Sequence, residues 1–330
     1  TPVLWSFRES EVGMMRKRCG ILLLTSFTFS VIFYMNYPRI PNRIKDGWWA
    51  FYHNKVVYPT NFKFLINNES ACKTQPPFLV ILVQTGLDHF EARMMIRESW
   101  ASRSTWSNKT VLTFFLLGKS PQEASMLKIQ KESTKYRDVL QQDFLDTYYN
   151  LTHKTRMGLQ WMAQFCPEGK FLLKTDGDVF INTEYLVNFL NNLEERSVPN
   201  FYTGFPFIGT KPHRWKESKF FLSKEEYSPD SYPPYCAGLG YLLSGHLTRR
   251  IFELSLHVKP VKFEDVYIGV CIKLLRVGLF EPQPNDVFHL YKVPFDVCRY
   301  AKLIAVHAVS PSEQRSFWNQ LVERDRNLHY

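Results

Sequence analysis

Two aspartates separated by one glycine, Asp176-Gly177-Asp178, form the most chemically suggestive cluster in the sequence. They directly follow the apolar segment 170–175, which is typical of a buried strand, so both carboxylates are expected at the carboxyl end of that strand, where open α/β sheets bind ligands. Two carboxylates at this spacing can bind Mn²⁺ or Mg²⁺ together with diphosphate oxygens. Because Asp-Gly is also a common turn dipeptide, a simple turn is the alternative interpretation.

A second acidic pair, Glu264-Asp265, opens a segment with helical periodicity. One of these carboxylates could act as a general base that removes the proton of an acceptor hydroxyl. Acidic residues are also favoured in the first turn of any helix by the helix dipole. The sequence does not separate these two explanations.

Imidazole and guanidinium groups could supply further contacts. His307 lies in the apolar run 303–309 and is either a core residue or a nitrogen ligand that completes a carboxylate site for Mn²⁺. Arg93 and Arg97 are spaced i and i+4 on a predicted helix, so they share a face that binds phosphate or base, or faces solvent. The glycines and aromatic residues of 235–241 suit either stacking on sugars or a structural loop.

The elements that must position these residues alternate between strand and helix. Short continuous apolar runs at 78–83, 111–117 and 170–175 predict strands buried on both faces. Helical character is found at 91–102, at 148–165, after the candidate N-cap Asn182, and at about 246–258 and 264–276. This alternation predicts an α/β fold with a mainly parallel sheet flanked by helices.

The N-terminal residues predict a membrane anchor. Residues 20–37 are uncharged and follow Arg16, Lys17 and Arg18, and their length is close to the ~20 apolar residues that span a bilayer. We therefore expect a cytosolic tail at 1–19, a transmembrane signal anchor at 20–37, a stem at 38–75 and a luminal catalytic domain at 76–330. A cleaved signal peptide is the alternative interpretation of the apolar stretch.

A luminal location would allow the cysteines to form disulfides and the sequons to carry N-glycans. Five of the six cysteines follow the predicted anchor, and two disulfides with one free thiol are the simplest arrangement, with no pairing readable from the sequence. The sequence predicts N-glycans at three sequon asparagines: Asn68, Asn108 and Asn150.

Charge and absent motifs limit the function classes. A formal net charge of +10 suits nucleic acid, an anionic nucleotide donor or an anionic membrane surface equally well. A luminal topology excludes nucleic acid. The sequence contains neither the P-loop pattern nor the nucleophile elbow of serine hydrolases, which excludes those enzyme classes.

Several segments in order resemble the β-1,3-galactosyltransferase family, which also includes β-1,3-N-acetylglucosaminyl- and N-acetylgalactosaminyltransferases. The resemblance covers about residues 76–310 and depends on the segments 77–83, 91–93 with 96–100, 114–118, 142–152, 174–182 and 263–269. Residues 257–265 and 329–330 look like the globoside-type N-acetylgalactosaminyltransferase branch, and residues 221–227 look like the type 5 galactosyltransferase branch.

The resemblance implies a GT-A fold, a type II Golgi membrane protein, a UDP-sugar donor and Mn²⁺. It further implies that Asp176 and Asp178 serve the metal and the diphosphate, that His307 is a third metal ligand, and that Asp265 is the catalytic base. Relatives often carry a larger residue where this chain has Gly177, which suggests a looser turn here.

The same resemblance places Arg93 and Arg97 near the nucleotide. The implied reaction is inverting transfer of N-acetylgalactosamine, or of galactose, to the 3-hydroxyl of a terminal sugar on a glycolipid or glycoprotein glycan. A β-1,3-N-acetylglucosaminyltransferase and a non-catalytic membrane-anchored glycan-binding protein are the alternatives. Neither the acceptor glycan nor the oligomeric state is predicted.

Overall fold

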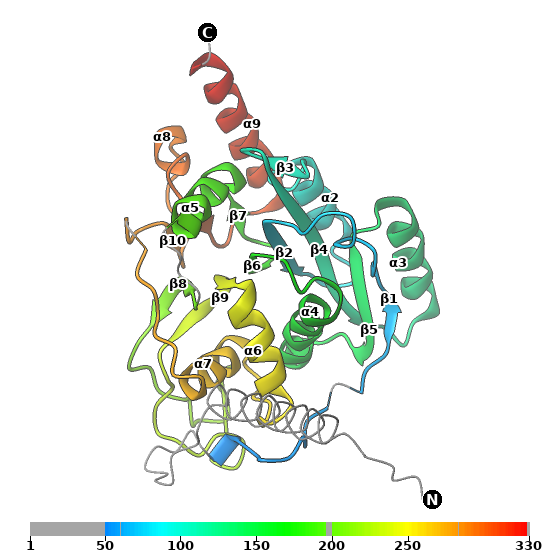
Figure 1. Ribbon diagram of the computed structural model, residues 1–330, viewed down its shortest axis with the longest axis vertical. Helices are drawn as coiled ribbons and strands as arrows, with labels where there is room; N and C mark the ends of the chain where they lie inside the picture. The colour runs from blue at the N-terminus through cyan, green and yellow to red at the C-terminus, as the bar shows by residue number, and fades with distance from the viewer. Residues whose placement is uncertain (1–49, 60, 196–199, 283, 329–330) are drawn as a thin grey trace, which may run out of the picture. The chain divides into compact units, whose positions relative to one another are not determined.

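The computed structural model describes residues 50–59, 61–195, 200–282 and 284–328 (Figure 1). The expected cytosolic tail (1–19) and transmembrane anchor (20–37) lie outside these residues. Within the described ranges, no helix combines the length and the apolar character that crossing a bilayer requires.

The main sheet is parallel at its centre and antiparallel at both edges. The central strands run parallel in the order β5, β4, β2 and β6, while β1 at one edge and β9 and β8 at the other run antiparallel to their neighbours. A short strand, β3 (Thr105–Trp106), pairs with β4. The sheet strands are β1 (Phe64–Ile66), β5 (Val139–Leu145), β4 (Lys109–Lys119), β2 (Leu79–Gln84), β6 (Phe171–Asp176), β9 (Tyr235–Ser244) and β8 (Tyr202–Phe207). The prediction of a mixed α/β fold around a mainly parallel sheet is confirmed.

The apolar central strands supply a core on each face of the sheet. Side chains alternate along a strand, so in β2 Val80 and Leu82 enter one core while Leu79, Ile81 and Val83 enter the other. The first core is closed by α4 (Leu151–Phe165), α6 (Gly245–Ser255) and α7 (Glu264–Leu274), which lie together in Figure 1. The second is closed by α2 (Phe90–Glu98), α5 (Thr183–Glu195) and α9 (Pro311–Leu328). Burial on both faces explains why these strands read as continuous apolar runs.

The remaining elements connect these layers. Helix α3 (Glu123–Tyr136) precedes β5, a 3₁₀ turn η2 (Tyr148–Asn150) leads into α4, and α8 (Val297–Tyr300) contacts α9. A second sheet has the order β10 (Phe288–His289), β11 (Ala305–Val306), β7 (Phe180–Ile181). The side chain of Asn182 accepts a hydrogen bond from the Tyr185 backbone N–H at 3.0 Å, so the predicted helix cap is confirmed.

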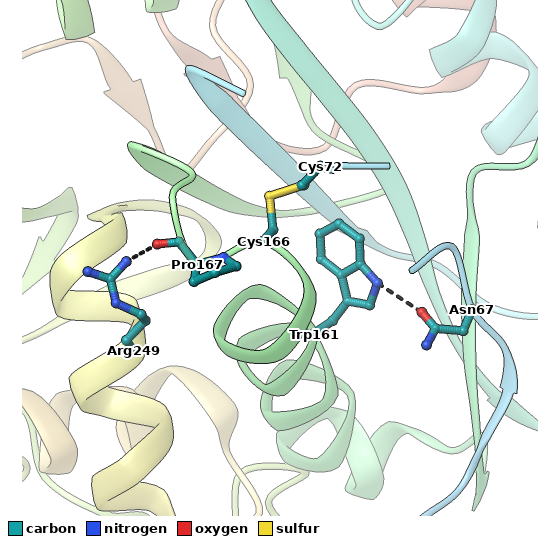
Figure 2. Close-up of a disulfide and its surroundings, with 6 residues drawn as sticks. All are labelled: Asn67, Cys72, Trp161, Cys166, Pro167 and Arg249. Atoms are coloured by element: carbon teal, nitrogen blue, oxygen red, sulfur yellow. Dashed lines mark hydrogen bonds between the residues drawn. A yellow bond between two sulfur atoms is a disulfide. The ribbon is translucent and has the colours of Figure 1, made fainter. Parts of the chain in front are cut away.

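The folded unit begins earlier than the expected boundary near Pro76. The described residues from position 50 onward lie in one compact unit, and β1 within it pairs with β5. The Trp161 indole N–H donates to Asn67 Oδ1 at 2.9 Å beside the Cys72–Cys166 disulfide, as Figure 2 shows. The described residues of the expected stem (38–75) therefore belong to the main folded unit, because long-range pairing and a covalent bond hold them there.

The cysteines differ from the expected pattern of two disulfides and one free thiol. In the described part of the chain, Cys72 and Cys166 form a single disulfide, and three thiols are free. Cys236 and Cys271 are buried, which raises the pKa of each thiol to about 12 and keeps it protonated. Cys298 is exposed.

Candidate active site

A cleft of about 990 Å³ opens at the carboxyl ends of β2 and β6. Gln84 and Asp176 are register partners at the ends of these adjacent parallel strands. The cleft is lined by residues from three stretches of chain and from the start of α9: 84–92, 146–154, 176–178 and Pro311. Parallel strands that end together thus bring the first predicted acidic cluster into a cavity of ligand size.

The Asp176-Gly177-Asp178 turn is fixed at its central glycine. The Gly177 N–H donates to the Gln84 carbonyl at 3.0 Å, and the Gln314 amide donates to the Gly177 carbonyl at 3.3 Å. A Cβ at Gly177 would lie 2.9 Å from Thr85 Cγ2. Glycine therefore permits a close approach to the end of β2, and the expectation of a looser turn is wrong for this backbone because both of its polar groups are bonded.

The first aspartate belongs to a buried charge network. Lys174 Nζ lies 2.8 Å from Asp176 Oδ1 and 2.7 Å from Glu264 Oε1, and it donates to the Gly238 carbonyl at 2.6 Å. Burial acts to lower the pKa of Lys174, but the charges of Asp176 and Glu264 outweigh it and raise that pKa. Burial raises the pKa of Asp176, and Lys174 opposes that rise. The ammonium therefore links the acidic turn to the first residue of α7.

The second aspartate faces His307. Asp178 Oδ2 lies 3.4 Å from His307 Nε2, and this contact lowers the pKa of Asp178 and raises that of His307. The second sheet causes the approach, since β11 pairs with β7 and the Val309 N–H donates to the Asp178 carbonyl at 3.0 Å.

The tautomer of His307 suits metal binding. His307 Nδ1 lies 3.1 Å from the Leu290 carbonyl, which can only accept, so Nδ1 carries a proton and the Nε2 lone pair of the neutral ring faces Asp178. A lone pair facing a carboxylate requires a proton or a cation between them, and this oxygen and nitrogen pair fits Mn²⁺. Among the described residues, no three His, Cys, Asp or Glu side chains converge as a metal cluster, and Asp176 is paired with Lys174.

Asp265, the predicted base, is held in the first turn of α7. Its two oxygens accept hydrogen bonds from the backbone N–H groups of Val266 at 2.8 Å and Gly238 at 3.2 Å. Burial, and then the charge of Glu264, raise the pKa of Asp265 to about 7. A carboxylate with this pKa can take up a proton near neutral pH, as a general base must.

Glu264, by contrast, has structural partners. Its Oε2 accepts hydrogen bonds from the hydroxyls of Thr155 and Tyr241, both at 2.9 Å. Tyr235 and Tyr241 are themselves buried in the core. Of the two interpretations of 235–241, stacking on sugars does not apply to these two rings, since neither presents a face to solvent.

Tyr148 connects Asp265 with the cleft. It lines the cleft with Asp176 and Asp178. Partial burial and then the charges of Asp265 and Asp176 raise its pKa. The charges of the predicted base and of the acidic turn therefore both act on one residue of η2.

Arg93 and Arg97 lie behind the cleft and do not line it. The Arg93 side chain has no exposed surface, and its guanidinium bonds both carboxylate oxygens of Glu132 at 2.8 and 2.7 Å. It also donates to the Gly86 and Leu87 carbonyls at 2.6 and 3.1 Å. Arg97 pairs with Glu132 and Asp138, each at 2.7 Å. In this geometry Arg93 positions the 86–87 loop at the cleft.

Two buried lysines near the cleft were not found from the sequence. Lys154 donates to the Thr85 carbonyl at 2.7 Å and to Asp146 at 2.8 Å, and burial lowers its pKa against the opposing charge of Asp146. Lys174 interrupts an otherwise apolar strand. That interruption was the available signal, because a charged side chain on a strand that is buried on both faces requires partners. Lys154 sits in a helix with ordinary polar neighbours and gave no such signal.

The three sequon asparagines differ in accessibility. Asn108 is exposed at the turn between β3 and β4, with φ of 60°. The amide nitrogens of Asn68 and Asn150 instead donate to the carbonyls of Arg137 at 2.9 Å and Leu145 at 2.8 Å. Asn108 is the most open of the three.

Comparison with known proteins shows which sequences this chain is similar to. The family profile described as Galactosyltransferase matches residues 91–283. The UDP-GalNAc:beta-1,3-N-acetylgalactosaminyltransferase 1 of Homo sapiens is 40% identical over 330 residues, covering 99% of each chain. The Beta-1,3-galactosyltransferase 2 of Mus musculus is 39% identical over 269 residues, which cover 81% of this chain and 64% of that protein.

Among solved structures, a glycosyltransferase involved in the glycosylation of the major capsid of PBCV-1 aligns with a TM-score of 0.37 at 14% identity, covering 74% of this chain and 100% of that one. The family assignment depends on the profile and the full-length relative. The chain belongs to the galactosyltransferase family.

Proposed function

We propose that this protein is an inverting, UDP-sugar-dependent β-1,3-glycosyltransferase with a GT-A type fold. The observation that carries the proposal is Asp265, a carboxylate with a pKa of about 7 that is fixed by the backbone N–H groups of Val266 and Gly238. The Gly238 carbonyl accepts from Lys174, which pairs with Asp176 in the wall of the cleft. Both named relatives are β-1,3-transferases.

The donor sugar proposed is N-acetylgalactosamine, with galactose as the second candidate. The relative named for UDP-GalNAc matches over 99% of its own length, whereas the galactosyltransferase matches over 64% of its length. The acceptor is the 3-hydroxyl of a terminal sugar on a glycolipid or glycoprotein glycan.

In the proposed reaction, Asp265 removes the proton from the acceptor 3-hydroxyl while that oxygen attacks the anomeric carbon of an α-linked UDP-sugar. The bond to UDP breaks on the opposite face, so a β-linkage forms. Asp178 and His307 would hold Mn²⁺, with Asp176 as a further ligand once it separates from Lys174. A bound Mn²⁺ supplies Lewis-acid neutralisation of the charge on the leaving diphosphate. The Arg93-bound loop and Lys154 shape the wall that faces the nucleotide.

The cellular setting proposed is the Golgi membrane, with a single type II anchor at 20–37 and a luminal catalytic domain. Support comes from the uncharged stretch preceded by basic residues. Glycosidase-sensitive migration of the full chain on a gel, with a smaller shift for Asn108→Gln, would support luminal exposure. Unchanged migration after glycosidase treatment would count against it.

A donor and acceptor screen tests the activity. The full chain, in membranes from expressing cells, is incubated with Mn²⁺ and UDP-GalNAc, UDP-Gal or UDP-GlcNAc, and with acceptors ending in galactose, N-acetylgalactosamine or N-acetylglucosamine. Acceptor-dependent UDP release and a β-1,3 product are expected, and Asp265→Asn should lower both by at least about a hundredfold. Glycan binding without any UDP release would favour a non-catalytic glycan-binding protein instead.

A further inference from the structure

A continuous strip of aromatic rings leads away from the proposed base. The ring centroid of His213 lies 4.4 Å from that of Trp215 and 5.8 Å from that of Phe220. The ring centroid of Phe220 lies 6.2 Å from that of Phe263. Lys262 Nζ lies 5.4 Å from the Phe263 ring and 5.6 Å from that of Tyr149. We call these residues the aromatic strip: Tyr149, Lys262, Phe263, Phe220, His213 and Trp215.

Several rings of the strip are exposed. Trp215 is 56% exposed, Phe220 42% and Tyr149 61%. Single exposed apolar residues are ordinary on protein surfaces, but a contiguous row of them marks a binding surface. The rings alternate with an ammonium and an imidazole, so the surface offers polar contacts as well as apolar faces.

The strip begins at the active site. Phe263 is the N-cap residue of α7 and directly precedes Glu264-Asp265. Tyr149 follows Tyr148, which lines the cleft and whose ring lies 5.7 Å from the Tyr149 ring. A molecule that presents a hydroxyl to Asp265 would therefore extend over the strip.

The outer half of the strip stands on a braced loop. Arg214, between His213 and Trp215, donates hydrogen bonds to the carbonyls of Leu222, Ser223, Tyr227 and Pro229 at 2.6 to 2.8 Å. His213 also forms a β-bridge with Phe221. These contacts hold exposed rings in place before any ligand arrives, which reduces the entropy lost on binding.

We propose that the aromatic strip is an acceptor subsite that binds the sugars next to the one that receives the transfer. This inference rests on the proposed function. Aromatic rings present flat apolar faces, and Lys262 and His213 supply hydrogen-bond donors between them, which matches a saccharide with its C–H faces and hydroxyls. An oligosaccharide is favoured over a lipid surface because the strip is interrupted by these polar groups and flanked by Lys216, Glu217 and Lys219.

Acceptor length is the measurement that tests the strip. The full chain is assayed with the methyl glycoside of the preferred terminal sugar and with a soluble trisaccharide that ends in the same sugar. Trp215→Ala and Phe220→Ala should each raise KM for the trisaccharide by about 3- to 10-fold, the range expected for one aromatic contact. KM for the methyl glycoside and for the UDP-sugar should not change, and Trp215→Phe should restore most of the loss.

A matched control is Leu127→Ala, which removes an apolar side chain of similar exposure on α3. It should leave both acceptors unaffected. Equal losses for the short and long acceptors in the strip variants, or no loss for either, would overturn the proposal. A loss seen only with glycolipid embedded in vesicles would also overturn it and would point to membrane contact.

Direct binding separates this inference from the proposed function. Trisaccharide titrated into the Asp265→Asn protein in the presence of UDP should bind, and the additional Trp215→Ala change should weaken binding by a similar factor. If the wild-type chain transfers no sugar but this Trp215-dependent binding remains, the proposed function fails and the subsite stands. Binding that does not depend on Trp215 would overturn the subsite.

Discussion

The pKa of Asp265 leads to a pH profile that can be measured. Because the ionised carboxylate is the base, activity should rise with pH as Asp265 loses its proton. With a pKa of about 7, about a tenth of Asp265 is ionised at pH 6 and about nine tenths at pH 8, so kcat/KM should rise roughly tenfold over this interval and level off above it.

The cause of the raised pKa gives a second perturbation. Burial contributes most and the charge of Glu264 contributes next. Glu264→Gln keeps one carbonyl oxygen that can accept from the hydroxyls of Thr155 and Tyr241 but removes the charge, so the midpoint of the profile should move to lower pH. Glu281→Gln, which neutralises an exposed carboxyl elsewhere, should leave the profile unchanged.

The same pKa predicts a stability effect of opposite sign to activity. A carboxyl whose folded pKa is raised favours folding at low pH, and this contribution is lost as pH rises through about 7. Because asparagine cannot accept the acceptor proton, Asp265→Asn should lower kcat by about 10²- to 10⁴-fold. At pH 8 its Tm should be equal to or higher than that of the wild type, because each pKa unit corresponds to about 1.4 kcal/mol before partial solvent exposure reduces it.

Initial rates between pH 5.5 and 8.5 at constant ionic strength and saturating Mn²⁺, together with thermal unfolding at pH 6 and 8, provide the assay. A flat profile across this range, or a profile that Glu264→Gln does not move, would refute the electrostatic reasoning. Near-normal turnover by Asp265→Asn would refute the assignment of the base.

Three further predictions concern the scaffold and the metal. Cys72→Ala removes a disulfide that spans a sequence separation of 94 residues. In a urea titration under non-reducing conditions, the free energy of unfolding should fall by about 2–5 kcal/mol. Cys298→Ala serves as the exposed control, and an equal effect of the two changes would contradict the prediction. Glu132→Gln leaves the buried Arg93 and the half-buried Arg97 without their shared carboxylate and should destabilise the protein by about 3–5 kcal/mol. The exposed Glu123→Gln should not, and matching urea midpoints for the two variants would argue against a structural role of the network. His307→Ala should raise the Mn²⁺ concentration for half-maximal activity at least about tenfold. The measurement is a Mn²⁺ titration of activity after EDTA has removed bound metal, and an unchanged titration would exclude His307 from the metal site.

Much of the fold was predictable because its central strands are buried on both faces. The apolar runs that predicted strands at 78–83, 111–117 and 170–175 correspond to β2, β4 and β6. The edge strands β1 and β8 were not predicted. β1 has only half-buried and exposed residues, and the 6-residue β8 contains a proline and a glycine, so neither carries a strong pattern.

The candidate site was predictable where its residues are close in the sequence. Asp176 and Asp178 share one turn, and Asp265 is fixed by its own helix start. The approach of His307 to Asp178 depends on two-residue strands, which leave no periodicity to detect. The i and i+4 spacing of Arg93 and Arg97 correctly placed them on one helix face, but their partner Glu132 lies on α3, 35 residues beyond Arg97, and no local pattern identifies it.

The disulfide also limits how far local unfolding can proceed from the N-terminal side of the chain. An unravelling that started before Phe51 would first separate the bridge between Tyr52 and Val258, and then β1 from β5, where only hydrogen bonds and side-chain packing resist. It would stop at Cys72, whose covalent bond to Cys166 cannot be opened by thermal fraying. Strand β2 begins at Leu79, after Cys72. Proteolytic cleavage or mechanical force that acts on the chain before Cys72 would therefore leave the pairing of Gln84 with Asp176, and with it the cleft, undisturbed.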